Sequence, residues 1–390
     1  MFSLTKEELT QMGAEITTRE IKQQPELWHE TLEIWQQHQA KIAEFLAKIE
    51  LDGHEKLRVV FTGAGTSQYV GDTILPYLRA HGDSKRYKFE SLGTTDIVSR
   101  PLEFLQPDEP TLLVSFARSG NSPESVAAIA IANKAVKNIY HLVITCAPEG
   151  KLAQNEKDKA NSYVLLMPAR SNDAGFAMTG SFSCMTLAAL LIFDSTDAKQ
   201  KASYVATAAK LGQQVIERET EIQTLVADDF ERIIYLGSGS LGGLTREAQL
   251  KVLELTAGKV ATVFDSSMGF RHGPKSFVNE KALVFDFVNN DEYTRQYDID
   301  VLEEIKGDQI AKHVVAIGQP GTPDFSGEKF FFSEDASKLP DGYLALADVM
   351  FAQTVALLAA VKIGNTPDTP SPTGTVNRVV KGVIIHDFSC

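Results

Sequence analysis

The sequence predicts an α/β fold of two tandem doubly wound domains, each with a parallel sheet flanked by helices. Three observations indicate it. Short apolar runs rich in β-branched residues alternate with helix-like stretches along most of the chain. The segment RIIYLGSGS (232–240) echoes RVVFTGAGT (58–66), so that Gly63 and Gly237 are 174 residues apart. The length of 390 residues suits two domains of ordinary size.

The first half shows the alternation from residue 57 onward. Apolar runs within 57–67, 111–122, 140–146 and 162–167 are expected to contain strands, and 69–80, 123–133 and 182–192 are expected to be helical. Buried strands that alternate with helices form β-α-β units, which predicts a parallel sheet. Before them, Leu4, Leu9 and Met12 share one helical face, so residues 3–50 are expected to form a helical lead-in.

The second half repeats the pattern: after the run 232–240 come strand candidates at 259–264, 281–287 and 313–318 and a long apolar helix at 342–363. The Pro-, Thr- and Gly-rich tail is expected to be extended and to wrap over a surface. We therefore divide the chain into a helical extension (1–50), a first domain (51–200), a helical linker (201–228), a second domain (229–364) and a C-terminal tail (365–390).

Composition excludes several classes of protein. With 43% hydrophobic and 23% charged residues, the chain can bury two cores and is not a disordered chain. The 38 Lys and Arg against 51 Asp and Glu give a net charge of −13, which argues against a nucleic-acid partner. A small anionic ligand responds to its local site, so the net charge does not exclude one.

Metal centres, disulfides and membrane segments are not expected either. The eight histidines form no HxH or HxxxH pair, and Cys146, Cys184 and Cys390 form no CxxC, which fits a reducing compartment. The N-terminus has no apolar signal region, and runs such as 184–193 and 355–361 fall short of the roughly 20 residues of a membrane span. A cytoplasmic protein without membrane contact is expected.

Two Gly- and Ser-rich turns are candidates for phosphate binding. The first contains Gly65, Thr66 and Ser67 after one strand. The second follows the strand at 111–117 and contributes Ser115, Arg118, Ser119, Gly120 and Ser122. Hydroxyls and helix-end N–H groups are the donors that a phosphate monoester needs, and ligands bind at the carboxyl edge of such sheets. A simply capped turn would account for Gly120 and Ser122, but it would not require Ser119, Thr66 and Ser67 as well.

Three charged residues share one face of the expected helix 242–256. Glu247, Lys251 and Glu254 are spaced i, i+4 and i+7. They could form a solvated salt-bridge ladder. Alternatively, a carboxylate beside a lysine in a partly dry cleft could move a carbon-bound proton, because such a setting tunes its proton affinity. The spacing alone leaves both readings open.

His272 lies in the loop GFRHGP (269–274). A single histidine is more often structural, but the flanking glycines and proline suggest a fixed, exposed loop of the kind that carries function. An imidazole titrates near neutrality and could act as a general acid or base. Its neighbour Arg271 could help to neutralise a phosphate.

At this point GAGTS (63–67) and SFARSGNSPES (115–125) resemble the SIS family, the sugar isomerase domains that bind phosphosugars. LGSGSLGGLTREAQLKVLELTAG (236–258) and GFRHGP resemble the isomerase half of glucosamine-6-phosphate synthase. The lead-in EITTREI, the segment SNDAGFAMT (171–179) and the tail PSPTGTVNRVVKGVIIHDF are similar to the bacterial branch of galactosamine-6-phosphate deaminase/isomerases, also called tagatose-6-phosphate ketose/aldose isomerases.

The resemblance implies roles for particular residues. Glu254 matches the base that moves a proton between C1 and C2, and Glu247 and Lys251 match its polar support. His272 matches the ring-opening histidine, which in relatives reaches a neighbouring subunit and so implies a homodimer or higher oligomer. Lys381 matches a tail lysine that contacts the sugar, although packing alone would also explain it. Met178 replaces a sugar-contacting serine, and Thr179 keeps a hydroxyl beside it.

The implied reaction converts galactosamine 6-phosphate and water to tagatose 6-phosphate and ammonia, without a metal or organic cofactor. The glutaminase domain of the synthase is missing here. Two alternatives remain open: a plain aldose–ketose isomerase of sugar phosphates that uses the same base, and a non-enzymatic sugar-phosphate-binding regulator. The pair Glu254 and His272, and a lead-in without a basic recognition face, favour an enzyme over the regulator.

Overall fold

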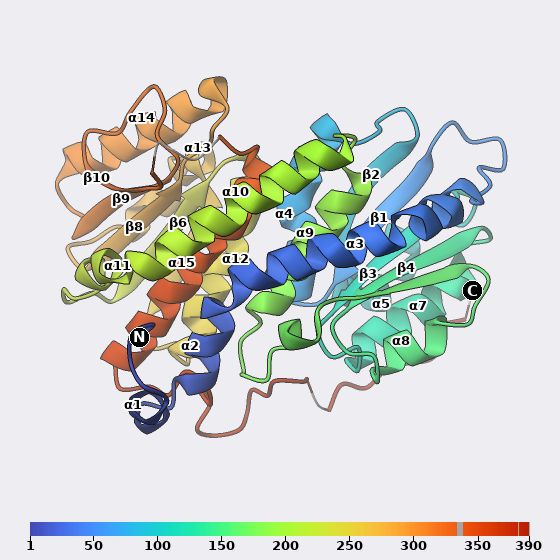
Figure 1. Cartoon of the computed structure of the whole chain (residues 1–390), viewed down its shortest axis with the longest axis horizontal. Coiled ribbons are helices and arrows are strands. Elements are labelled where there is room, and N and C mark those ends of the chain that lie inside the picture. Colours follow the sequence, from blue (N-terminus) through green and yellow to red (C-terminus); the bar gives the residue numbers. More distant parts are fainter. Residues whose placement is uncertain (334–337, 381, 390) are drawn as a thin grey trace. The chain divides into compact units, whose positions relative to one another are not determined.

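The computed structural model describes residues 1–333, 338–380 and 382–389 and divides into two compact units. Unit 1 comprises residues 1–26, 174–179 and 202–373, and unit 2 comprises residues 27–173, 180–201 and 374–390, in both cases apart from the undescribed positions. Figure 1 shows their elements coloured along the chain. The domain boundaries drawn from the sequence stay a prediction.

Unit 2 contains one five-stranded parallel sheet. Its strands are β1 (Leu57–Gly63), β2 (Tyr87–Gly93), β3 (Thr111–Ala117), β4 (Ile139–Thr145) and β5 (Ser162–Leu166). They are ordered β2-β1-β3-β4-β5, with β1 and β3 paired from Arg58↔Thr111 to Thr62↔Ser115. The predicted parallel sheet is therefore confirmed. Strand β2 was not predicted, because it is an edge strand in which polar residues interrupt the apolar run.

Helices cover both faces of this sheet. Val60 of β1 and Leu113 of β3 point into a buried cluster with residues of α5 (Thr94–Ser99), α7 (Pro123–Ala135) and α8 (Lys151–Glu156), next to the short α6 (Pro101–Phe104). On the other face Phe61 packs against Phe89, Phe116 and Phe193, under α4 (Thr66–His81) and α9 (Gly180–Phe193). The helical turn η1 (Ala169–Ser171) precedes α9.

Unit 1 contains a second parallel sheet with the same topology. Its strands are β6 (Arg232–Gly237), β7 (Ala261–Ser266), β8 (Ala282–Phe287), β9 (His313–Gly318) and β10 (Glu328–Phe331), ordered β10-β9-β8-β6-β7. In both sheets the first strand in the chain lies between the second and the third. The tandem arrangement predicted from the echo of Gly63 at Gly237 is confirmed. The short strand β10 was not predicted.

Two long helices of unit 1 pack together on one face of its sheet. They are α12 (Gly239–Leu255) and α15 (Asp341–Lys362), while α13 (Ser267–Phe270), η2 (Pro274–Phe277) and α14 (Glu292–Asp308) lie on the other side of the sheet (Figure 1). The unit also includes α1 (Lys6–Gln11), α2 (Glu15–Lys22), α11 (Glu219–Leu225) and most of α10 (Ala198–Glu217).

Helix α15 corrects one expectation. The long apolar helix expected at 342–363 is present, and it is long and apolar enough to cross a membrane by length and composition, whereas the apolar runs of the sequence were expected to fall short of a membrane span. Buried side chains account for 94% of its most apolar window, as in the core helix of a folded domain. It is the only such helix in the part of the chain that the structure describes.

The two ends of the chain follow the predicted pattern. The lead-in is helical, with α1, α2 and α3 (Gln24–Ala47). Residues 374–380 and 382–389 form no helix or strand and group with unit 2, which agrees with an extended tail.

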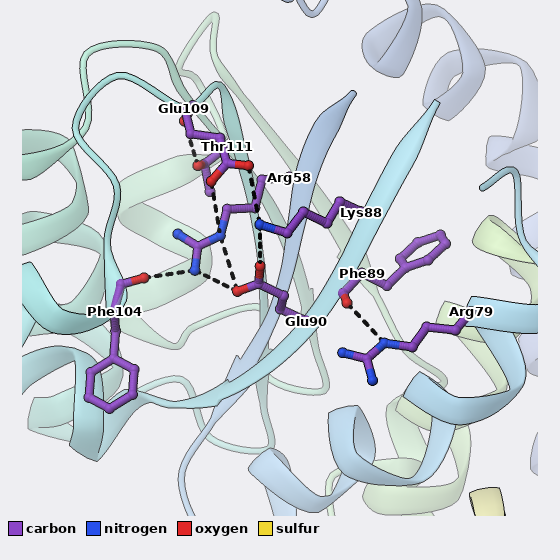
Figure 2. A network of polar contacts seen from close by, with 8 residues as sticks. All are labelled: Arg58, Arg79, Lys88, Phe89, Glu90, Phe104, Glu109 and Thr111. Atoms are coloured by element: carbon purple, nitrogen blue, oxygen red, sulfur yellow. Dashed lines mark hydrogen bonds and ion pairs between the residues drawn. The ribbon is translucent and has the colours of Figure 1, made fainter. Parts of the chain in front are cut away.

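The amino edge of the unit 2 sheet is closed by a network of charged side chains (Figure 2). The guanidinium of Arg58 donates from Nη2 to Glu90 Oε2 at 2.6 Å and to the carbonyl of Phe104 at 2.8 Å. Lys88 Nζ lies 3.0 Å from Glu90 Oε1 and 3.4 Å from Glu109 Oε1. These contacts tie the starts of β1 and β2 to the segment before β3, away from the edge where the candidate phosphate turns lie.

Candidate functional site

The first predicted phosphate turn joins β1 to α4 in unit 2. A Cβ added to Gly63 would lie 2.4 Å from the carbonyl carbon of Ser67, so only glycine lets the first turn of α4 come this close to the strand. Gly65 is the N-cap of α4 and has a φ of 56°. Thr66 and Ser67 follow it and are buried. The turn is compact, and its helix begins at the carboxyl edge of the sheet.

The second predicted turn joins β3 to α7 beside the first. Ser115 is buried in β3, paired with Thr62 of β1. Gly120 has a φ of 64°, in the left-handed region that favours glycine. The N-cap of α7 is Ser122, followed by Pro123, but the Ser122 side chain caps no amide of the helix among the described hydrogen bonds. A ligand could therefore accept from the start of α7.

Contacts from the next loop hold the second turn in place. The amide of Leu152 donates to the carbonyl of Gly120 at 3.0 Å, and the amide of Lys151 donates to Asn121 Oδ1 at 3.1 Å. Ser119 Oγ accepts from the amide of Asn121 at 3.3 Å. The structure thus brings both predicted turns to the ends of neighbouring parallel strands, where hydroxyls and a helix N-terminus favour an anion.

Arg118 anchors the C-terminal tail. Its buried guanidinium donates from Nη2 to the carbonyl of Arg378 at 2.6 Å. Arg378 in turn donates from Nε to the carbonyl of Asp173 at 2.9 Å and from Nη2 to Asn172 Oδ1 at 3.2 Å. Sequence reasoning missed Arg378 and Asp173, because only the fold brings positions 173 and 378 together.

The segment before α9 is held by carboxylates at both ends. In unit 2, Asp173 accepts from the amides of Gly180 and Ser181 at 3.0 and 2.9 Å, which fixes the start of α9. In unit 1, Glu20 accepts from the amide of Ala174 at 2.6 Å. Thr179, the predicted sugar-binding residue of this segment, is buried in unit 1.

The predicted charged face of α12 is the most distinctive feature of unit 1. Lys251 Nζ lies 2.5 Å from Glu254 Oε2 and 3.4 Å from Glu247 Oε1. Lys251 and Glu247 are fully buried, and the Glu254 side chain is 23% exposed. A solvated ladder would expose all three residues, so burial argues against that reading. Glu254 is the carboxylate that a ligand can reach.

His272 lies on an exposed loop just after α13 in unit 1. Its backbone amide donates to the carbonyl of Gly269 at 2.9 Å. None of the described interactions joins His272 to Glu254. The neighbouring Arg271 donates from Nε to Glu304 Oε2 at 2.7 Å, so its charge is already paired within unit 1. Lys381, the other residue assigned by resemblance, lies outside the described residues.

In the part of the chain that the structure describes, we find neither a reactive thiol nor a group of side chains that could hold a metal ion. Burial raises the pKa of the Cys146 thiol to about 12 and that of Cys184 well above its ordinary value, so both thiols are unreactive. Both are free, and Cys390 is outside the described residues. In the described ranges, no three His, Cys, Asp or Glu residues form a group that could hold a metal ion.

Comparisons with known proteins agree with the fold and the turns described above. A family model described as the SIS domain matches residues 54–193, which contain the sheet of unit 2 and both of its turns. The chain is thus a protein with the SIS class of α/β domain.

Full-length relatives define the family more narrowly. The chain is 43% identical to a D-galactosamine-6-phosphate deaminase AgaS of Escherichia coli, over 95% of this chain and 96% of the relative. It is 39% identical to the AgaS of a Shewanella species, over 99% and 95%. The crystal structure of tagatose-6-phosphate ketose/aldose isomerase from Escherichia coli has a TM-score of 0.85 at 39% identity, covering 96% of this chain and 97% of that one. The chain belongs to the AgaS family of SIS-domain proteins.

Proposed function

We propose that this protein is a deaminating isomerase that converts galactosamine 6-phosphate and water to tagatose 6-phosphate and ammonia. Membership of the AgaS family supports this substrate. The observation that carries the chemistry is the partly exposed carboxylate of Glu254, held at 2.5 Å by the buried ammonium of Lys251. A fixed carboxylate that a ligand can reach is suited to moving a proton between neighbouring carbon atoms.

Substrate binding is assigned to unit 2. Ser119, Ser122, Thr66 and Ser67, with the start of α7, would bind the dianionic phosphate through hydroxyl and amide donors. Ser115, Arg118, Gly65 and Gly120 shape these turns. Thr179, which the family resemblance assigns to the sugar, belongs to unit 1. This assignment accommodates an anionic substrate in a protein of net charge −13, because the donors are mostly neutral.

The reaction would proceed in three steps. First, His272 moves the proton of the anomeric hydroxyl to the ring oxygen, which opens the ring to the C1 aldehyde. Next, Glu254 takes the C2 proton, the C2–H electron pair forms the C1=C2 double bond, and the carbonyl oxygen takes a proton from the C2 ammonium group of the substrate, which gives a C1 hydroxyl and a C2 amine. Glu254 then returns the proton to C1, which leaves an imine at C2. Finally, water adds to that imine and ammonia leaves, so the overall reaction is hydrolytic.

A second candidate is a plain ketose/aldose isomerase. The similar Escherichia coli protein of known structure favours it, since that protein is called a tagatose-6-phosphate ketose/aldose isomerase. The same base would act on a substrate with a C2 hydroxyl, and no ammonia would form. Assays with galactosamine 6-phosphate and galactose 6-phosphate distinguish the two, because only the deaminase turns over the first and releases ammonia.

The decisive experiment compares two glutamate variants. Glu254→Gln is expected to abolish ammonia release from galactosamine 6-phosphate, because the amide cannot accept the C2 proton. Glu280→Gln, at an exposed position of the same unit, is the matched control and should retain full activity. Full activity of Glu254→Gln would disprove the proposed mechanism.

The proposal includes a cytoplasmic homodimer in which His272 serves the partner subunit. Mixing Glu254→Gln chains with His272→Asn chains tests this arrangement. If His272 acts across the interface, mixed dimers contain one intact site and regain activity, whereas His272 acting in its own chain gives no recovery.

A further inference from the structure

A buried carboxylate gathers the hydrogen-bond donors at the carboxyl edge of the unit 1 sheet. Asp298, in the second turn of α14, is fully buried. Its Oδ1 accepts from the hydroxyls of Ser238 at 2.5 Å and Ser267 at 2.7 Å. Its Oδ2 accepts from the amide and the side-chain nitrogen of Asn289, both at 3.1 Å. Four donors therefore converge on one side chain, which is the environment of a bound anion.

These donors come from the ends of three neighbouring strands. Ser238 follows β6 and is the N-cap of α12, Ser267 follows β7 and begins α13, and Asn289 lies just after β8. In unit 2 the corresponding places follow β1, β2 and β3, and they include both candidate phosphate turns. The network around Asp298 thus occupies the part of unit 1 that matches the candidate phosphate site of unit 2.

The helices α14 and α7, which follow the third strand of each sheet, differ in whether a side chain caps their N-terminus. In unit 1 the N-cap of α14 is Asp291, whose carboxylate accepts from the amide of Thr294 at 2.9 Å. In unit 2 the N-cap of α7 is Ser122, whose side chain makes no capping bond in the described structure. The donors of unit 1 are satisfied by its own carboxylates, whereas the start of α7 is left for a ligand.

The neighbours of Asp298 favour its ionised, negatively charged form. Asp286 is also fully buried, and its only described contact is with Ser267 Oγ at 3.4 Å. Burial, reinforced by Asp298, raises the pKa of Asp286 well above its ordinary value. Because Asp298 accepts four hydrogen bonds and Asp286 has a single long one, we assign the negative charge to Asp298. Burial raises the pKa of Asp298 as well, but its four hydrogen bonds oppose that rise. The cation of Arg295 lies one turn earlier in α14 and favours the carboxylate.

We propose that the carboxyl edge of unit 1 is an anion site that the chain fills with its own Asp298 carboxylate, so that each chain binds one phosphosugar, in unit 2. The part that concerns the phosphosugar rests on the proposed function. The part that concerns Asp298 depends only on the contacts within unit 1.

Chemical rescue tests the anion site. Asp298→Gly removes a CH2–COO− group, and acetate has the size and charge of the missing group. Millimolar acetate is expected to raise the Tm of Asp298→Gly by several degrees and to leave the wild type unchanged. Acetamide, a neutral molecule of the same shape, is the control and should give little stabilisation. Asp300→Gly, at an exposed position of the same helix, should respond to neither compound. Equal rescue by acetamide, or none by acetate, would overturn the anion site.

Binding stoichiometry tests the second part and does not need the Asp298 variant to fold. Calorimetry of the Glu254→Gln chain with galactosamine 6-phosphate is expected to give one site per chain, lost in the additional Ser119→Ala/Ser122→Ala variant. Two sites per chain would contradict the inference. Failure to bind any galactosamine 6-phosphate would count against the proposed function and against the stoichiometry, but acetate rescue would still decide the role of Asp298.

Discussion

The ammonium of Lys251 lies 2.5 Å from Glu254 and 3.4 Å from Glu247, and it is fully buried between a carboxylate that solvent reaches and one that it does not. Burying a cation is costly unless opposite charges compensate it. The opposite charges of Glu247 and Glu254 compensate the buried cation, and the same cation fixes the exposed carboxylate of Glu254. Lys251 is therefore expected to affect both the stability of the protein and the proposed chemistry.

Replacing Lys251 should therefore lower both the stability and the activity. Lys251→Met leaves the buried Glu247 without this cation, and breaking a buried pair in this way costs about 3–5 kcal/mol. We expect urea denaturation to show that loss and ammonia release to fall at least tenfold. The double variant Lys251→Met/Glu247→Gln removes the stranded charge and should recover part of the stability without recovering the activity. Recovery of both would mean that Lys251 has no role in catalysis.

Hydroxyls of the second turn in unit 2 should affect binding rather than turnover. Ser119→Ala and Ser122→Ala each remove one neutral donor, worth about 0.5–1.5 kcal/mol, so KM should rise about two- to tenfold while kcat changes little. Steady-state kinetics with galactosamine 6-phosphate measures both constants. Ser99→Ala, at an exposed position on α5, is the matched control. A loss confined to kcat would move these serines from phosphate binding to the chemical step.

Sequence reasoning found the strands that are buried on both faces, and also the partly exposed edge strands β5 and β7. β1 and β3 are continuous apolar runs because helices cover both sides of the unit 2 sheet. β2 was missed because, as an edge strand, it alternates apolar residues with Lys88 and Glu90, which belong to the charged network at the amino edge. A strand is found from sequence where its apolar run is continuous, and it is missed where charged residues interrupt the run.

The candidate site residues also divide into those that a local sequence pattern reveals and those that only the fold brings together. The Gly and Ser turns were visible because their residues are contiguous, and the face of α12 was visible because helical spacing is regular. Whether that face is exposed or buried depends on the tertiary packing around α12, which helical spacing does not show, so the spacing alone left two readings. The contacts of Asp298 join positions as far apart as 238 and 298, and no local pattern reveals them.

One titration should be measurable at the start of α15. Burial raises the pKa of Asp341 from its ordinary value of 3.8 to about 6. A carboxyl with a raised folded-state pKa contributes stability that is fully present below about pH 3.8 and is lost as pH rises through about 6. A difference of this size corresponds to about 3 kcal/mol.

Asp341→Asn keeps an oxygen to accept from the amide of Asn290, now 2.8 Å from Asp341 Oδ1, and removes the charge. The variant should be more stable than the wild type at pH 7.5, by up to about 3 kcal/mol, and no more stable at pH 4. Urea denaturation at both pH values checks this. Asp300→Asn should show no such difference, because that residue is exposed. A gain for Asp341→Asn that is equal at both pH values would rule out the ionisation of Asp341 as its cause.

The charged network at the amino edge of unit 2 gives a last prediction, about stability alone. Arg58 is only 4% exposed and holds Glu90 together with the carbonyl of Phe104, whereas Lys88, in the same network, is 53% exposed. Burial alone would raise the pKa of Glu90, but the hydrogen bonds and charge of Arg58 outweigh burial and lower it.

Arg58→Met should therefore cost about 3 kcal/mol, since it removes the buried cation that binds Glu90 and the donor to the Phe104 carbonyl, while Lys88→Met should cost less than about 1 kcal/mol because water screens an exposed pair. Urea denaturation of the two variants measures the difference, and KM and kcat should be unchanged in both because the network lies at the edge opposite the phosphate turns. Equal costs for the two substitutions would show that burial does not set the strength of this network.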